Sequence, residues 1–181
     1  MRTIRMGTYG LPSTCKPRDT HIRMIWEWIV LKECDGKALL LSRDIIDWEM
    51  YHGENTFFER AKPTTWEKCN LRELMKDYYE KGFTAGEKVR ILTNELGDHL
   101  FLLTAEEADR YLRTKECRIA EMIMADGSKV FRERPYWWLN TTGAEECMQQ
   151  VMTPEGEIDD EGIDNDADEV GVRPAMWVKW W

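Results

Sequence analysis

The stretch IRMIWEWIVLKECDGKALLLS, residues 22–42, decides the fold class. In its first half, apolar and polar residues alternate, which is the period of a β-strand. Asp35 and Gly36 then supply the positive φ angles of a tight turn, and a second apolar run follows. The sequence therefore predicts a β-hairpin from about Met24 to Ser42 with one strongly apolar face. That face carries Ile22, Met24, Trp26, Trp28 and Val30.

Three short helices are predicted downstream of this hairpin. Each expected start combines a threonine with a glutamate three residues later, so that the hydroxyl and the carboxylate can satisfy backbone N–H groups at the helix end. Apolar residues at helical spacing follow each start, and we expect these stripes to pack on the sheet. The pairs are Thr64 with Glu67, Thr84 with Glu87, and Thr104 with Glu107.

Strand patterns return around and after the third helix start. The run HLFLLT, residues 99–104, predicts a short buried strand, and residues 119–124 and 129–134 predict a second hairpin across Ala125-Asp126-Gly127-Ser128. The order of strands, helices and strands indicates an α+β fold, with short helices on one side of an irregular, mostly antiparallel sheet. The length of 181 residues fits a single domain over residues 1–181.

The net charge of −9 is concentrated in one segment. Residues 155–169, EGEIDDEGIDNDADE, hold nine acidic residues and no basic residue, and the rest of the chain is neutral. We interpret this segment as an acidic loop within the domain. Because the chain has no basic footprint, direct binding to DNA or RNA is not expected. No apolar run has the length of a membrane span or the form of a signal peptide, so we expect a cytoplasmic protein that does not contact the membrane.

The cysteines argue against a metal or disulfide scaffold. The five residues form an odd set without a C-x-x-C spacing, which predicts free thiols and no metal cofactor at these positions. The histidines have no local context that would mark a nucleophilic triad, so we do not expect an enzyme.

Eight motifs, taken in chain order, resemble a family of uncharacterised bacterial domains that is frequent in gut bacteria and their mobile elements. The resemblance spans about residues 5–178. The family looks like a branch of the formylglycine-generating-enzyme type of C-type-lectin-like fold. The motifs are G-x-Y (7–9), W-x-V-L (28–31), ALLLS with DIID (38–47), T-W-E-x-x-x-L-R (65–72), F-T-x-x-E-K (83–88), F-L-L-T-x-E-E-A (101–108), W-W-L (137–139) and G-V-R-P-A-M-W (171–177).

The resemblance implies that residues 171–177 form the closing strand of the fold, buried beside Trp26 and Trp28, with Trp177 as an anchor. The arginine in this stretch, Arg173, is expected to be structural, with its guanidinium tying down nearby carbonyls or a carboxylate. The two terminal tryptophans lie past the resemblance, where they either extend the core or form a patch that supports a homodimer. The expected structural residues are Trp28, Trp137, Arg173 and Trp177.

The expected function is binding rather than catalysis, with a protein as the partner. Nine carboxylates without counter-charges attract a basic protein, and in a fixed array they would imitate a nucleic-acid backbone. We therefore expect an accessory protein of a phage or mobile element that blocks a basic or nucleic-acid-binding host factor. One of Trp137 and Trp138 should face outward beside a loop and contact the partner. The expected partner-binding residues are Trp138, Asn140, Asp159, Asp160, Asp164, Asp166, Asp168 and Glu169.

Two other functions stay open at this stage. The first is recognition of a glycan or small ligand, assisted by calcium, because Asp164, Asp166 and Asp168 have the D-x-D-x-D spacing with which calcium loops begin. An EF-hand is excluded, since its glycine and its final glutamate are replaced by Glu169 and Ala175. The second is a residual enzyme of the formylglycine-generating type, which the resemblance implies would need a close cysteine pair and copper.

Overall fold

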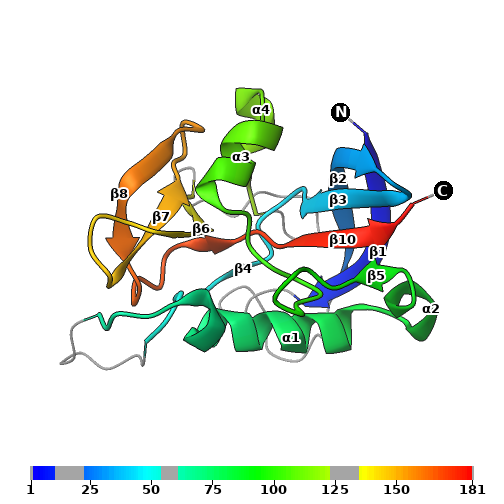
Figure 1. The fold of residues 1–181 in the computed structure, drawn as a ribbon, viewed down its shortest axis with the longest axis horizontal. Coiled ribbons are helices and arrows are strands. Elements are labelled where there is room, and N and C mark those ends of the chain that lie inside the picture. Colours follow the sequence, from blue (N-terminus) through cyan, green and yellow to red (C-terminus); the bar gives the residue numbers. More distant parts are fainter. Residues whose placement is uncertain (1, 11–22, 54–60, 123–134, 181) are drawn as a thin grey trace.

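The computed structural model describes residues 2–10, 23–53, 61–122 and 135–180. The architecture is α+β, with two mostly antiparallel five-stranded sheets and a few short helices (Figure 1). The strands are β1 (Thr3–Gly10), β2 (Arg23–Cys34), β3 (Lys37–Ser42), β4 (Asp47–Trp48), β5 (Ile91–Leu92), β6 (Trp137–Thr142), β7 (Met148–Met152), β8 (Ile158–Asp164), β9 (Gly171–Val172) and β10 (Ala175–Lys179). The helices are η2 (Trp66–Lys68), α1 (Asn70–Gly82), α2 (Ala85–Lys88), α3 (Ala105–Tyr111) and α4 (Lys115–Arg118).

The first sheet has the order β1-β2-β3-β10-β5 and contains the predicted hairpin. Strands β2 and β3 pair through the turn at Asp35 and Gly36, which both have positive φ angles. The indoles of Trp26 and Trp28, two residues apart on one face, stack with their ring centres 4.5 Å apart. Phe83 stacks on Trp26 just after α1 ends. This aromatic group anchors α1 to the sheet, and the side chain of Trp28, which was expected to be structural, is fully buried.

The second sheet has the order β4-β9-β6-β7-β8, in which only the β6 and β9 pair of the described strands is parallel. The chain passes from β9 in this sheet to β10 in the first sheet across Arg173 and Pro174. The expectation of one closing strand over residues 171–177 is therefore wrong. Proline carries no N–H group for a ladder, and it stands where the chain changes sheets. The junction between the sheets is built on these two residues.

Arg173 holds the two sheets and α4 together. Its side chain is fully buried, and its guanidinium donates hydrogen bonds to the carbonyls of Ser42, Arg43, Cys117 and Arg118 at 2.9 to 3.3 Å. The ring of Trp137 lies 4.9 Å from its guanidinium carbon. Burial lowers the pKa of Arg173 to about 10, so the side chain is still charged at neutral pH. Arg173 and Trp137, both expected to be structural, are fully buried.

Trp177 differs from its predicted role as a buried anchor. It lies in β10 between Leu39 of β3 and Leu92 of β5, as a strand residue in the middle of the first sheet. Its neighbours Met176 and Val178 point into the core and are fully buried, whereas Trp177 is half-buried. Because side chains alternate along a strand, Trp177 faces the other side of the sheet, where a groove remains open.

Two of the three predicted helix starts are confirmed. Thr84 with Glu87 and Thr104 with Glu107 form complete capping boxes. The pair of Thr64 and Glu67 does not, because the chain first makes the short η2 and α1 begins later with the thiol of Cys69 as its cap. The helices also do not share one side of the molecule. Figure 1 shows α1 along one side and α3 and α4 on the opposite side.

The remaining expectations have mixed outcomes. Residues 99–104 contribute one isolated bridge, Phe101 to Ala175, rather than a strand. The second predicted hairpin lies largely outside the described residues, and the described residues 119–122 carry no strand. Trp180 is half-buried under a contact with Arg2, while Trp181 lies outside the described residues, so homodimer formation stays a prediction. None of the helices in the described part of the chain is long and apolar enough to cross a membrane.

Candidate functional site

The middle of the acidic segment is a β-strand at the edge of the second sheet, whereas residues 155–157 and 165–169 lie in turns and irregular backbone. The interpretation of the segment as one loop is therefore wrong for residues 158–164. Residues 158–164 form β8, which pairs with β7 on one side (Figure 1, orange). Ile158 and Ile163 pack against the core and supply the apolar contacts that the strand needs. The acidic side chains between and after them are therefore carried by ordered backbone.

A bulge in β8 fixes the direction of these side chains. The carboxylate of Asp159 accepts hydrogen bonds from the backbone N–H groups of Glu161 and Gly162, both at 3.2 Å. Gly162 has a φ angle of 85°, and a Cβ atom there would stand 2.5 Å from the carbonyl oxygen of Gln149. Only glycine allows this close passage. The carboxylate of Asp159 thus occupies two backbone N–H groups of this edge strand, and charged side chains lie along it. For both reasons, β8 is a poor template for pairing with a neutral strand from another chain.

The segment after β8 is held by a buried asparagine. Asn165 is fully buried, its N–H donates to the carbonyl of Cys147 at 2.9 Å, and its carbonyl accepts from the N–H of His52 at 2.9 Å. Its side-chain amide also donates to the carbonyl of Lys62 at 3.0 Å. These bonds fix the backbone between the carboxylates of Asp164 and Asp166. The set of acidic residues on both sides of Asn165 is thus carried by ordered backbone.

We call this set the acidic face. Five of its members are exposed and two, Asp159 and Asp166, are half-buried. Glu161 is part of the acidic face, although it is missing from the predicted partner-binding residues. Its acidic neighbours in the sequence would have been sufficient reason to include it. The acidic face consists of Asp159, Asp160, Glu161, Asp164, Asp166, Asp168 and Glu169.

The calcium pattern is not assembled into a ligand set. Among the described residues, no three acidic, histidine or cysteine side chains gather in a group that could hold a metal ion. The structure thus does not bring Asp164, Asp166 and Asp168 together as a ligand set. Calcium-assisted binding stays a prediction.

The expectation that Trp138 contacts a partner is wrong. Both indoles of the W-W pair are fully buried, because each face of β6 is covered. Tyr51 packs edge-on against Trp138 with ring centres 5.7 Å apart, and the indole N–H of Trp138 donates to the carbonyl of Glu49 at 2.7 Å. Asn140 is half-buried, and its side-chain carbonyl accepts from the hydroxyl of Tyr51 at 3.1 Å. Neither residue lies on the acidic face.

A second candidate site is an open groove of 860 Å³ between β5, β10 and α3. Two residues with different predicted roles line it: Asn140 was predicted to bind a partner, and Trp177 was predicted to be structural. Exposed Leu96 borders it as an apolar side chain, and Arg110 of α3 adds a charge. Polar and charged residues make up most of the rest of its lining, so the groove is not a mainly apolar pocket. Its lining includes Leu92, Leu96, Phe101, Arg110, Asn140 and Trp177.

Two of the cysteine thiols, those of Cys69 and Cys147, are not activated as nucleophiles. The four described cysteines are free. Burial raises the pKa of the Cys69 thiol to about 11, and burial together with the charges of Glu145 and Asp164 raises the pKa of Cys147. Because the thiolate is the reactive form, both thiols are poorer nucleophiles at neutral pH.

Comparison with known proteins gives one finding. A family model described as Domain of unknown function (DUF6273) matches residues 35–180. No curated protein and no solved structure gives a significant match.

Proposed function

We propose, for a chain that belongs to the family described as Domain of unknown function (DUF6273), a non-catalytic binding function in which the acidic face engages a basic protein. The observation that carries this proposal is the placement of the carboxylates. Four of them stand on the edge strand β8 and three follow it, and the bulge of β8 and the buried Asn165 hold this backbone. The charges are therefore arranged before a partner arrives. Pre-arranged groups bind with a smaller loss of conformational freedom than groups on a loose loop.

The charge of the acidic face determines the chemistry of the partner. A surface with seven acidic residues between positions 159 and 169 favours a partner that is rich in lysine and arginine, and it speeds the encounter at low ionic strength. Because Asp159 occupies two backbone donors of the edge, we expect contact through carboxylate side chains rather than through strand addition. A surface of carboxylate side chains is what a protein needs in order to occupy the site where its partner would bind a nucleic-acid backbone.

The proposed setting follows from the resemblance described above. A cytoplasmic accessory protein of a phage or mobile element that blocks a nucleic-acid-binding host factor would use such a surface. The lectin-like fold implied by the same resemblance is part of this proposal and is compatible with the α+β architecture. A residual enzyme is the least supported of the proposals, because the two thiols discussed above have raised pKa values.

The acidic face is tested by a charge-neutralised variant. Changing Asp160, Glu161, Asp164 and Asp168 to asparagine or glutamine leaves Asp159 in place to hold the bulge. We expect this variant to bind a fluorescent oligolysine peptide at least about tenfold more weakly, since each lost charged contact contributes on the order of 1 kcal/mol. Fluorescence anisotropy measures the affinity, and displacement of duplex DNA from a basic DNA-binding protein measures mimicry.

The control variant removes the same number of charges from other elements. It changes Glu73, Glu80, Glu106 and Glu116, all exposed on helices, to glutamine. It should bind oligolysine within about twofold of the unchanged protein at moderate salt, where distant charges are screened. Equal weakening in both variants would show that net charge, and not the acidic face, governs binding, and no binding by the unchanged protein would refute the proposal.

A second function is favoured by the groove beside Trp177. Its volume of 860 Å³ fits a small ligand, and a half-exposed indole is a stacking surface for a sugar ring or another flat group. Recognition of a glycan or small ligand at this groove is the alternative proposal. The lining of this groove includes none of the acidic-face residues, so the two proposals differ in location.

A further inference from the structure

The groove beside Trp177 carries more acidic than basic side chains. Four acidic and two basic residues line it, so two negative charges are in excess. Its volume of 860 Å³ lies within the range of small-molecule sites. The charged residues of the lining are Asp35, Lys37, Glu95, Glu106, Glu107 and Arg110.

Two of the acidic side chains already have partners. Glu106 forms an ion pair with Arg110 one helical turn later, and Glu107 completes the capping box at the start of α3. Asp35 and Glu95 are exposed and, in the described part of the chain, form no ion pair. These two carboxylates therefore remain to receive a charged ligand.

Segments on both sides of β10 bring these carboxylates to the groove. Trp177 of β10 pairs with Leu39 of β3 and with Leu92 of β5. Asp35 stands in the turn that precedes β3, and Glu95 stands in the loop that follows β5. A ligand on the indole of Trp177 would therefore lie between two segments that each carry a carboxylate.

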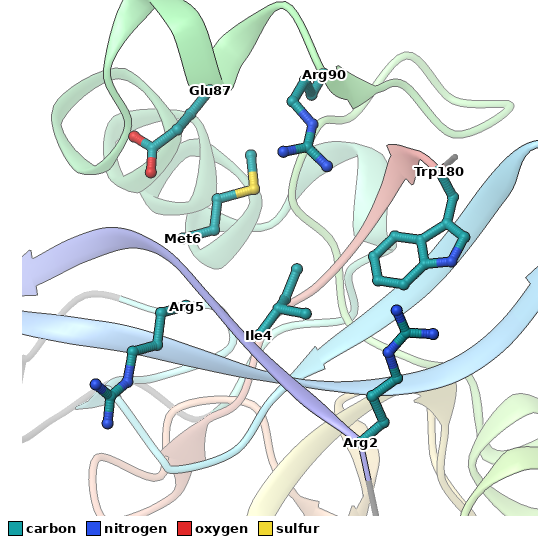
Figure 2. A pocket seen from close by; sticks show the side chains of 7 residues that line it. All are labelled: Arg2, Ile4, Arg5, Met6, Glu87, Arg90 and Trp180. Carbon is teal, nitrogen blue, oxygen red and sulfur yellow. The ribbon is translucent and has the colours of Figure 1, made fainter.

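Two other indoles of the protein already hold a guanidinium. The guanidinium carbon of Arg173 lies 4.9 Å from the centre of the Trp137 ring, and that of Arg2 lies 4.6 Å from the centre of the Trp180 ring. Figure 2 shows Arg2 and the indole of Trp180 beside the N-terminal strand. Trp177 is half-buried, and within the described residues no cation and no aromatic ring is stacked on it. Its exposed indole surface is thus open to a stacking ligand.

The cavity drawn in Figure 2 has the opposite balance of charge. It has a volume of 300 Å³ and lies between β1, the end of α2 and the residue after β10, and three arginines and one glutamate line it. This balance disfavours a cation there and favours one in the groove. Of the two hollows, the groove is therefore the one that suits a cationic ligand.

We infer, on the basis of the second function proposed above, that the groove binds a flat organic cation of the guanidinium or amidinium type on Trp177. The face of the cation would lie on the indole, whose π-system attracts positive charge. Its N–H groups would point to the carboxylates of Asp35 and Glu95, since a flat cation of this type offers paired donors that match carboxylate oxygens. An apolar arm of the ligand would lie on Leu92 and on the exposed Leu96.

Titration of isotope-labelled protein with benzamidine tests this site, and the chemical shifts of the amide and indole N–H groups measure the affinity and locate the contact. Benzamide is the matched neutral compound, and butylammonium carries the charge without the flat face. We expect benzamidine to bind at least about fivefold more tightly than either, since only benzamidine combines stacking with charge-assisted hydrogen bonds. The shifts should change around Trp177 and Leu92 and stay unchanged around Trp180.

Four variants test the residues that would hold the cation. Trp177→Leu should weaken benzamidine binding about fivefold or more, and Glu95→Gln should weaken it about threefold. Glu155→Gln is the matched control, because it removes the same charge from an exposed turn outside the groove; it should change the affinity by less than about 1.5-fold. Lys37→Met removes a repelling charge from the lining and should strengthen binding about twofold. Circular dichroism confirms that each variant is folded.

Methyl glucoside, a neutral sugar, separates the cation site from the function on which it rests. Binding of methyl glucoside around Trp177 without binding of benzamidine would overturn the cation site and leave ligand binding at the groove in place. Equal affinity of benzamidine and benzamide, equal affinity of benzamidine and butylammonium, or equal effects of Glu95→Gln and Glu155→Gln would do the same. If none of these compounds changed the shifts around Trp177, both the cation site and the second proposed function would be refuted.

Discussion

Changing Arg173 to alanine should lower the free energy of unfolding by about 4 kcal/mol, because it removes a fully buried charged group that satisfies four carbonyls. Two of these carbonyls, those of Ser42 and Arg43, lie at the end of β3, and the other two lie at the end of α4. Without the guanidinium, the carbonyls of Ser42, Arg43 and Cys117 lose this donor, whereas the carbonyl of Arg118 keeps the indole N–H of Trp137. A cavity also opens beside Trp137. Urea-induced unfolding, followed by tryptophan fluorescence, measures the change.

Two further arginine variants give this prediction its control. Arg110→Ala removes an arginine whose side chain is 59% exposed and whose ion pair with Glu106 joins neighbouring turns of one helix. It should change the stability by less than about 0.5 kcal/mol. Arg173→Lys should fall between the two, since the ammonium keeps the charge but lacks the planar fork. A loss below about 1 kcal/mol for Arg173→Ala would contradict the role of this residue as the tie between the sheets and α4.

Changing Trp138 to alanine should cost about 4 kcal/mol of stability, because the mutation leaves a large cavity in the core. The indole is fully buried, packs against Tyr51 and donates to the carbonyl of Glu49, so both its apolar area and its hydrogen bond are lost. Thermal unfolding and urea titration measure the effect. The neighbouring Tyr136→Ala is the control, since Tyr136 is 38% exposed and should cost about 1 kcal/mol or less. Comparable losses for the two variants would contradict the assignment of Trp138 to the core.

Local patterns in the sequence were sufficient to predict the elements whose signals are local. The alternating residues of β2 and the turn at Asp35-Gly36 predicted the hairpin, and the capping boxes at Thr84 and Thr104 predicted two helix starts. The helix start predicted at Thr64 is not formed, because the thiol of Cys69 caps α1 instead. The two possible helix starts, at Thr64 and at Cys69, lie only a few residues apart and exclude each other. Propensity alone does not decide such a competition.

Features that depend on distant contacts were not predicted correctly. The charges of β8 suggested a loop, yet Ile158 and Ile163 pair it with β7 and place it at a sheet edge. Trp138 was expected to be exposed because the sequence does not show that Tyr51 would cover it. The acidic residues themselves were recognised, since a concentration of charge is visible without a fold.

The central claim, that the acidic face is the binding surface, is tested most directly by mapping the contact on the protein. The measurement is a titration of isotope-labelled protein with an oligolysine peptide, followed by the chemical shifts of the backbone amides. We expect the largest changes between residues 159 and 169, with little change in the residues around Trp177. Changes gathered along the groove beside Trp177, or spread evenly over the acidic residues of the helices, would contradict the claim.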